Sequence, residues 1–161
     1  MNVKIFTTGG TIDKIYFDAK STFQVGEPQV VEVLREANVT QAYEVASLMQ
    51  KDSLEMTDED RQLIYDAVTA DSSPHIVITH GTDTMALTAA ALRGIPDKTI
   101  VLTGAMSPAR FRLTDAVFNI ASAFTAAQTL PPGVYLAMNG QVFPAGRVRK
   151  NVPENRFELI E

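Results

Sequence analysis

The chain has 161 residues, of which 45% are hydrophobic and 20% charged, and its formal net charge is -5 at pH 7. This composition is typical of a single globular domain, and its acidic balance argues against nucleic acid as a partner, because phosphate binding needs clustered Lys and Arg. The sequence lacks cysteine and holds two histidines, which rules out disulfides, thiol catalysis and a thiolate metal site. We expect no metal and no cofactor.

The N-terminal segment of the sequence carries no targeting signal of a familiar type. Its apolar stretch is too short for the hydrophobic region of a signal peptide, and no run reaches the length of a membrane span. We therefore expect a cytoplasmic protein that does not bind membranes. No linker or low-complexity tract interrupts the chain, so residues 1–161 are expected to form one domain without a separate C-terminal domain.

Short β-branched runs alternate with amphipathic segments along the chain, which favours parallel strands joined by crossover helices. In chain order we expect a strand at 3–7, a helix at 28–36, a strand at 43–48, a helix capped by Thr57 with an apolar stripe over 63–68, a strand at 76–79, a helix at 84–92, a strand at 99–102, a helix at 115–129 and strands at 135–138 and 141–143 around an Asn139-Gly140 turn. The chain after Ala145 reads as irregular, with a short docking segment at 157–160.

This alternation predicts an α/β fold with three layers, α/β/α. The sheet is expected to be mostly parallel and doubly wound, of the flavodoxin-like or Rossmann-like type, with a C-terminal β-hairpin. The carboxyl ends of its strands would then share one edge, where ligands bind in such folds. Polar segments follow four of these strands, namely TGGT at 8–11, DS at 52–53, HGTD at 80–83 and TGAM at 103–106.

Each of these polar features has an ordinary structural interpretation beside the functional one. The glycine pair before Thr11 could form a phosphate-binding or merely tight turn, and Asp83 could be the N-cap of a helix. Lys150 could belong to a solvated basic turn with its arginine neighbours. For His80 we favour a buried position in which its hydrogen bonds are satisfied.

Two segments carry a resemblance to a known family. TGGTI at 8–12 and HGTDTM at 80–85 are intact signatures of the bacterial-type asparaginases, and DSLEM at 52–56 resembles a third segment of that family. The similarity extends through VLTGAM at 101–106, Asp115, Phe118-Asn119 and the hairpin leading to Lys150. The chain thus resembles a short asparaginase that corresponds to the N-terminal domain of ordinary members.

The resemblance implies an amidohydrolase that releases ammonia from L-asparagine, with weak action on L-glutamine. Thr11 matches the family's nucleophile, and Thr82, Asp83 and Lys150 match its supporting residues, with Lys150 expected in a buried ion pair with Asp83. The implied substrate-binding residues are Gly10, Asp52, Ser53, Gly81, Thr82, Asp83 and Ala105. Backbone N–H groups of the glycine-rich loops could hold the developing oxyanion.

The sequence departs from the family in two respects. Where members usually carry a loop tyrosine, this chain has Phe23, and we expect Tyr16 to take that role. Ordinary members are about twice as long and add a domain that contributes to a neighbouring subunit's site. We therefore expect a homo-oligomer, a dimer or larger, in which a neighbour lies close to the loop that carries Tyr16.

Two other functions stay open beside the enzyme. The first is a noncatalytic, regulatory domain that binds an amino acid. The second is a nucleotide-binding α/β domain, which is weakened because the sequence lacks a full GxGxxG motif and a P-loop lysine. The intact set of Thr11, Thr82, Asp83 and Lys150 favours the enzyme.

Overall fold

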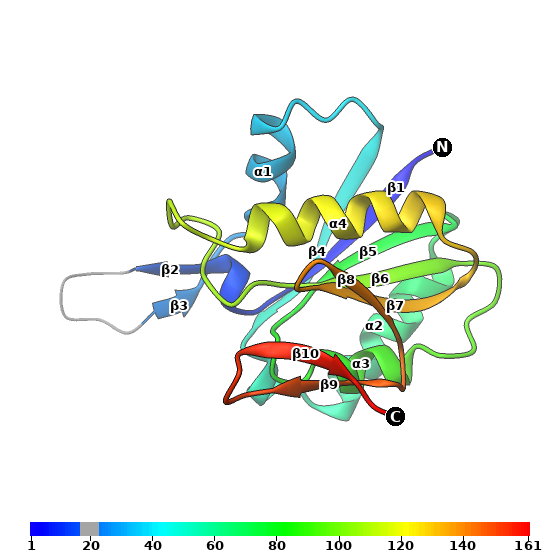
Figure 1. Cartoon of the computed structure of the whole chain (residues 1–161). Coiled ribbons are helices and arrows are strands. Elements are labelled where there is room, and N and C mark those ends of the chain that lie inside the picture. The colour runs from blue at the N-terminus through cyan, green and yellow to red at the C-terminus, as the bar shows by residue number, and fades with distance from the viewer. Residues whose placement is uncertain (17–22) are drawn as a thin grey trace.

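Six strands form the central sheet of the computed structural model, which describes residues 1–16 and 23–161 and the side chains of 1–15 and 24–161. They are β1 (Val3–Gly9), β4 (Tyr43–Lys51), β5 (His75–Thr79), β6 (Thr99–Thr103), β7 (Gly133–Met138) and β8 (Gln141–Pro144). Their order is β4-β1-β5-β6-β7-β8, with β8 antiparallel and the others parallel (Figure 1). This is the flavodoxin-like order, so the predicted fold class is confirmed.

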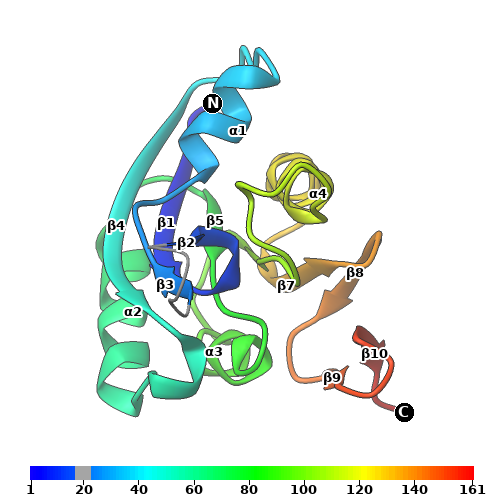
Figure 2. The ribbon, with the colours of Figure 1, turned by 90° about the vertical axis from the view of Figure 1, so that its left-hand side faces the viewer.

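Four helices cover the two faces of this sheet. Helices α1 (Val30–Glu36) and α4 (Ala116–Thr129) lie on one face, and α2 (Asp58–Ala70) and α3 (Met85–Ala91) lie on the other (Figure 2). The inner strands supply both cores by alternation: in β5, Val77 packs beneath α1 and α4, whereas Ile76 and Ile78 pack against α2 and α3. The strands therefore read as continuous apolar runs, as is typical of buried parallel sheets.

Helix α2 shows how far local sequence signals hold. Thr57 caps the helix as predicted, and the cap is a full capping box: the Thr57 hydroxyl accepts from the backbone N–H of Asp60, and the Asp60 carboxylate accepts from that of Thr57. Ile64 and Val68 are fully buried, as expected from the apolar stripe. Leu63 is 46% exposed, so the predicted stripe was too wide on that side.

Two hairpins beyond the sheet were not predicted. After Ala145 the chain is not irregular: β9 (Val148–Asn151) pairs with β10 (Arg156–Leu159), and Phe157 from β10 is buried in the core beside α3. Near the N-terminus β2 (Lys14–Tyr16) pairs with β3 (Phe23–Val25). Strands of three or four residues give too little alternation to stand out in a sequence.

The sheet brings the four polar segments to one edge. The 3-10 turn η1 (Thr11–Asp13) follows β1, and η2 (Ser53–Glu55) follows β4. The HGTD and TGAM segments follow β5 and β6, which are parallel to β1 and therefore end on the same side. Within the described part of the chain, no helix is long and apolar enough to cross a bilayer.

Candidate active site

Glycine contacts hold the loops of the strand ends against one another. A Cβ atom added to Gly10 would lie 2.5 Å from the backbone of Gly81, and one added to Gly81 would lie 2.6 Å from Oγ of Ser53. Gly104 is held as closely, with the carbonyl oxygen of His80 in the place of its missing side chain. The glycines are thus needed for close backbone approach, which joins four separate sequence motifs into a single cluster.

The packing of Gly10 leads to a prediction for stability. Gly10 and Gly94 have similar positive φ angles, 89° and 93°, but nothing lies within 4 Å of a Cβ built on Gly94. Gly94→Ala therefore carries the backbone strain alone, whereas Gly10→Ala adds a clash with the backbone of Gly81. We expect Gly10→Ala to be less stable than Gly94→Ala by about 1–3 kcal/mol, measured by urea unfolding. Equal losses would show that the two loops separate easily.

Lys150 joins the C-terminal hairpin to the HGTD loop. Its Nζ donates to Oγ1 of Thr82 at 2.8 Å and to Oδ1 of Asp83 at 2.8 Å. The N-cap of α3 is Thr84, and Asp83 precedes it. Two of the ordinary interpretations are therefore wrong: Asp83 does not cap the helix, and Lys150, in β9, is not part of a solvated turn.

The ion pair lies nearer to solvent than expected. The side chains of Lys150 and Asp83 are 15% and 40% exposed, so the prediction of a buried pair is wrong. Strand β9 lies in a separate two-stranded sheet with β10 and leaves the pair partly open to solvent. Thr82 is enclosed beneath them, at 6% exposed. A cation that donates to an enclosed hydroxyl makes the proton of that hydroxyl easier to remove.

Ser53 and Asp52 occupy different environments in the second segment. Ser53 is buried, and its Oγ accepts from the backbone N–H of Thr84 at 3.3 Å, which leaves its own proton free to donate. Asp52 caps η2 by accepting from the N–H of Leu54, and it is partly exposed. Its carboxylate also lies 3.4 Å from Nζ of Lys14 in β2, a contact that the sequence did not predict.

Asp115 and Asn119 position the fourth loop. The Asp115 carboxylate accepts from the backbone N–H groups of Met106 and Ser107, and the Asn119 side chain donates to the carbonyl of Gly104 at 2.8 Å. Ala105, between these anchors, is 1% exposed. Both anchoring residues lie in the stretch that resembles the family, and the sequence signal for their role is an acidic residue at a helix start with an amide one turn later.

His80 is a structural residue, as expected from the sequence. It is fully buried, its Nδ1 lies 2.7 Å from the carbonyl of Gly81 and its Nε2 lies 2.7 Å from the hydroxyl of Thr88. Burial lowers the pKa of His80 to about 4. A neutral imidazole with both nitrogens engaged orients the HGTD loop and has no free atom for the substrate.

Asp13 directly precedes β2 and is hydrogen-bonded to the chain that follows β3. Its carbonyl accepts from the N–H of Gly26 at 2.8 Å, and its Oδ1 accepts from the N–H of Gln29 at 2.9 Å. The side chain is 2% exposed, and burial raises the pKa of Asp13 to about 7, opposed by the Gln29 hydrogen bond and aided by the charge of Glu27. The residue two positions after Thr11 thus titrates near neutrality.

Asp13 and His80 predict opposite effects of pH on stability. Folded Asp13 binds its proton more tightly than the unfolded chain does, so stability falls as pH rises from about 4 to about 7. Folded His80 binds its proton less tightly, so stability rises between about 4 and 6.5. In wild type the two slopes partly cancel below 6.5.

Asp13→Asn should separate these two effects. We expect the variant to gain stability relative to wild type as pH rises from about 4.5 to about 8, with an upper bound of about 4 kcal/mol. Urea unfolding at both pH values measures the difference. A constant offset between the two proteins would contradict a carboxyl group that is neutral in the folded state.

All but one of the side chains predicted for the site lie in the described part of the structure. The side chains that reach solvent are those of Thr11, Asp52, Asp83 and Lys150, and those enclosed are Ser53, Thr82 and Ala105. The side chain of Tyr16 lies outside the described part of the structure, so its role stays a prediction. Among the described residues, no group of three or more His, Asp or Glu residues could hold a metal ion.

The sheet order and the polar cluster at its edge define a flavodoxin-like α/β domain with a hydroxyl-rich site at the strand ends. A family model described as "Asparaginase, N-terminal" matches residues 2–158. The chain therefore belongs to the asparaginase family and corresponds to its N-terminal domain.

Relatives and solved structures agree with this assignment. The chain is 36% identical to a glutaminase-asparaginase of Acinetobacter glutaminasificans, covering 94% of this chain and 50% of the relative. It is 34% identical to an L-asparaginase of Thermococcus kodakarensis (99% and 51%) and 32% identical to a probable periplasmic L-asparaginase of Haemophilus influenzae (92% and 46%). The chain thus spans about half the length of these relatives.

The structure of the thermostable L-asparaginase from T. kodakarensis superposes with a TM-score of 0.86 at 31% identity, covering 99% of this chain and 51% of that one. L-asparaginase I from Vibrio cholerae gives 0.84 at 29% identity, with 98% and 51% covered. Relatives include proteins named cytoplasmic and periplasmic. Family membership is compatible with either compartment, and the cytoplasmic location stays a prediction.

Proposed function

We propose that the chain hydrolyses L-asparagine to L-aspartate and ammonia, with weaker action on L-glutamine. The observation that supports this most is the contact of Lys150 with Thr82 and Asp83, on a loop that packs directly against Gly10 and so lies beside Thr11. A hydroxyl nucleophile needs such a polarising partner nearby.

In the proposed reaction the Thr11 hydroxyl attacks the side-chain amide carbon of the substrate. A Thr11–acyl bond forms, the carbon–nitrogen bond breaks, and the hydroxyl proton leaves with the amine as ammonia. Water then attacks the acyl carbon, the bond to Thr11 breaks, and aspartate is released as the hydroxyl regains a proton. Backbone N–H groups of the glycine-rich loops stabilise the oxyanion in both steps.

We assign the other residues by their surroundings. Lys150 polarises the Thr82 hydroxyl, while Asp83, which reaches solvent, holds the α-ammonium group of the substrate. The Ser53 hydroxyl donates to the α-carboxylate, and Asp52, Gly81 and Ala105 line that end of the site. Tyr16, carried on β2, is the group that we propose approaches Thr11 from the loop side.

Ammonia release from L-asparagine, L-glutamine and D-asparagine tests the proposal. We expect the highest rate with L-asparagine and a lower rate with L-glutamine, because the longer side chain shifts the amide carbon relative to Thr11. Binding of L-asparagine with no ammonia release would instead favour a noncatalytic amino-acid-binding domain. A nucleotide-binding domain is disfavoured, because the three-residue turn η1 follows β1 where such domains begin a helix.

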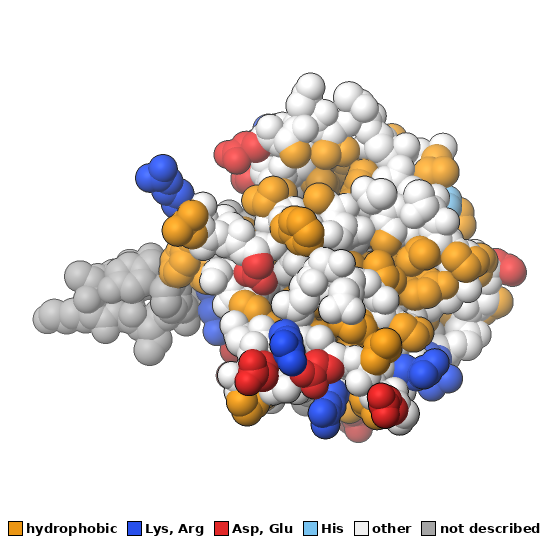
Figure 3. All heavy atoms as spheres, viewed as in Figure 1, with side chains coloured by type: hydrophobic (Ala, Val, Ile, Leu, Met, Phe, Trp, Pro, Cys, Tyr) orange, Lys and Arg blue, Asp and Glu red, His pale blue; other side chains and the backbone are white. Residues whose placement is uncertain are grey.

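The site is open on the side where four of its side chains meet solvent. We therefore propose that the chain forms a homo-oligomer. We expect a neighbouring copy to supply that wall close to the β2–β3 hairpin. Figure 3 shows apolar side chains gathered on the face that carries α4, where Val117 and Phe118 are exposed, and such a surface suits an interface.

Light scattering at working concentrations, together with activity on dilution, checks the assembly. We expect a dimer or larger species whose specific activity falls as it dissociates. A monomer that stays fully active when dilute would contradict this. The substrate ammonium would then be held by this chain's own acids, with Asp83 and Asp52 the first to mutate.

A further inference from the structure

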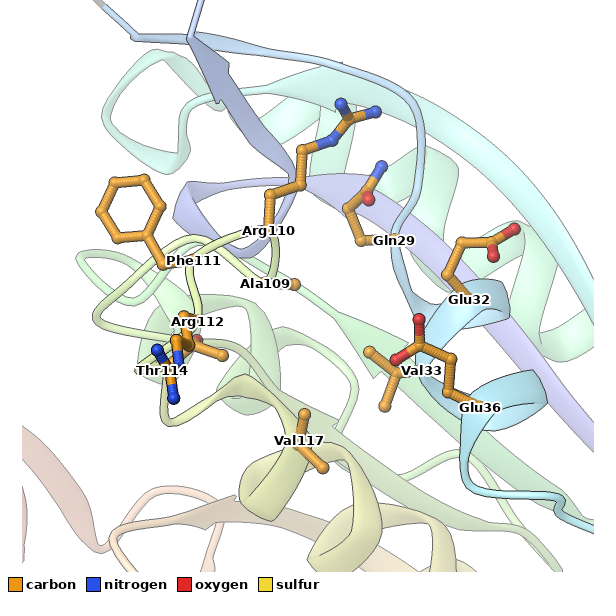
Figure 4. A pocket seen from close by; sticks show the side chains of 10 residues that line it. All are labelled: Gln29, Glu32, Val33, Glu36, Ala109, Arg110, Phe111, Arg112, Thr114 and Val117. Carbon is orange, nitrogen blue, oxygen red and sulfur yellow. The ribbon is translucent and has the colours of Figure 1, made fainter.

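A groove of about 660 Å³ lies between α1 and the loop at 109–114, on the α1 and α4 face of the sheet (Figure 4). This volume falls within the range of about 300–1,000 Å³ that is usual for small-molecule sites. Its lining includes none of the residues proposed above for catalysis or substrate binding. The groove is therefore a separate feature of the molecule.

The two walls of this groove carry opposite charges. Arg110 and Arg112 lie on the loop wall, and Glu32 and Glu36 lie one helical turn apart on α1. Glu32 pairs with Arg35 on its own helix at 2.8 Å. Among the described residues, no ion pair or hydrogen bond engages the side chains of Arg110, Arg112 or Glu36. Both charges are thus available to a ligand.

Between Arg110 and Glu36 the lining holds neutral and apolar side chains together with Glu32, whose charge is paired with Arg35. Figure 4 draws Arg110 and Gln29 toward one end and Glu36 beside Val33 toward the other, with Val117 on the α4 side. The Gln29 amide donates to the carbonyl of Glu27, which leaves its side-chain oxygen free to accept. A ligand with a carboxylate, a short polar backbone and an ammonium group would place a complementary group against the positive end, the middle and the negative end of the groove.

We propose that the groove binds a short peptide, with its C-terminal carboxylate on Arg110 and its N-terminal ammonium on Glu36. A polyanion would be repelled by the glutamates and a polycation by the arginines, whereas a dipolar ligand satisfies both walls. A single amino acid is much smaller than the groove and holds its two charges one carbon apart. A peptide of about three residues fills more of the space.

The groove is connected to the segment that carries Thr11. The backbone N–H of Ala109, on the loop wall, donates to the carbonyl of Ile12 at 3.0 Å. The N–H of Gln29, at the start of α1, donates to Oδ1 of Asp13 at 2.9 Å. Ile12 and Asp13 directly follow Thr11 in η1. A ligand that draws the two walls together would therefore act on η1 through both of these hydrogen bonds. This regulatory step rests on the proposed function, whereas binding itself does not.

Calorimetric titration with tri-L-alanine tests the binding. We expect Arg110→Gln and Glu36→Gln each to weaken the affinity about tenfold, the loss of one charge-assisted hydrogen bond. Arg147→Gln and Glu59→Gln make the same charge changes at exposed positions outside the groove and should leave the affinity unchanged. N-acetylated tri-L-alanine has no ammonium group for Glu36 to contact. It should therefore bind wild type and Glu36→Gln equally.

Several outcomes would overturn the assignment. No heat with tri-L-alanine, or equal losses in the Arg147 and Glu59 controls, would remove the site. L-alanine bound as tightly as the tripeptide would show that the ligand is a single amino acid. Self-association that is lost in Arg110→Gln, without peptide binding, would show that the groove joins two copies of the chain. Ammonia release measured with saturating peptide then tests the regulation apart from the binding.

Discussion

Replacement of Thr11 by alanine is expected to reduce ammonia release from L-asparagine to below about 1% of the wild-type rate. The variant lacks the only atom that we propose forms the acyl-enzyme, and water attacking the amide directly would have no positioned nucleophile in its place. Thr11 lies in the three-residue turn η1 and is partly exposed. Its loss should therefore change the free energy of unfolding by less than about 1 kcal/mol.

Thr11→Ser is the matched control for this prediction, because it retains the hydroxyl and removes a methyl group. We expect it to keep measurable activity. Rates should be measured under one set of conditions for both variants, together with urea unfolding to show that both are folded. Alanine at this position with more than a few per cent of wild-type activity would rule out Thr11 as the nucleophile.

The layer architecture could be predicted from the sequence because its strands are buried on both faces. Runs such as Ile76–Thr79 are continuously apolar and flanked by helices with clear caps, so pattern and propensity agree. The sequence does not decide between the flavodoxin-like and the Rossmann-like strand order, because right-handed βαβ connections are compatible with both. The helix start at Thr57 was clear, since two hydrogen bonds in its capping box depend on residue type alone.

The hairpins could not be predicted in this way. In β9, alternation covers only four residues, and its partner β10 is recognisable chiefly by Phe157, a single buried aromatic. What anchors the hairpin to the rest of the fold is long-range: the backbone N–H of Phe157 donates to the side chain of Asn139, 18 residues away in the turn between β7 and β8. Such a contact follows from the tertiary structure and leaves no local pattern.

Within the site, the sequence motifs indicated which residues meet but not how deeply they lie. The buried state predicted for Lys150 and Asp83 depended on what covers the sheet edge, which motif spacing does not specify. Asp13 carries no local sequence signal of its burial, for a similar reason. An aspartate after TGGTI reads as an ordinary polar turn residue, and only the return of the chain at Gln29 encloses it.

Lys150→Met is expected to lower the rate of ammonia release by about 100-fold or more, since a positioned proton-transfer partner is worth about 10²–10⁴. Methionine keeps most of the length and apolar character of the lysine stem, so β9 should stay packed on α3. The Thr82 hydroxyl would then lose the cation that donates to it at 2.8 Å. Asp83 would lose its ion-pair partner but stay in contact with solvent, because 40% of its side chain is exposed.

Stability distinguishes this loss from a structural effect. Because the ion pair is partly solvated, we expect Lys150→Met to cost no more than about 1 kcal/mol, much less than the loss from a fully buried pair. Arg149→Met is the matched control: Arg149 is the preceding residue of β9 and its side chain, 66% exposed, contacts Glu158 at 3.4 Å on β10. It should lose similar stability and keep its activity. If both variants lost activity equally, the integrity of the hairpin, and not the charge of Lys150, would be what the reaction requires.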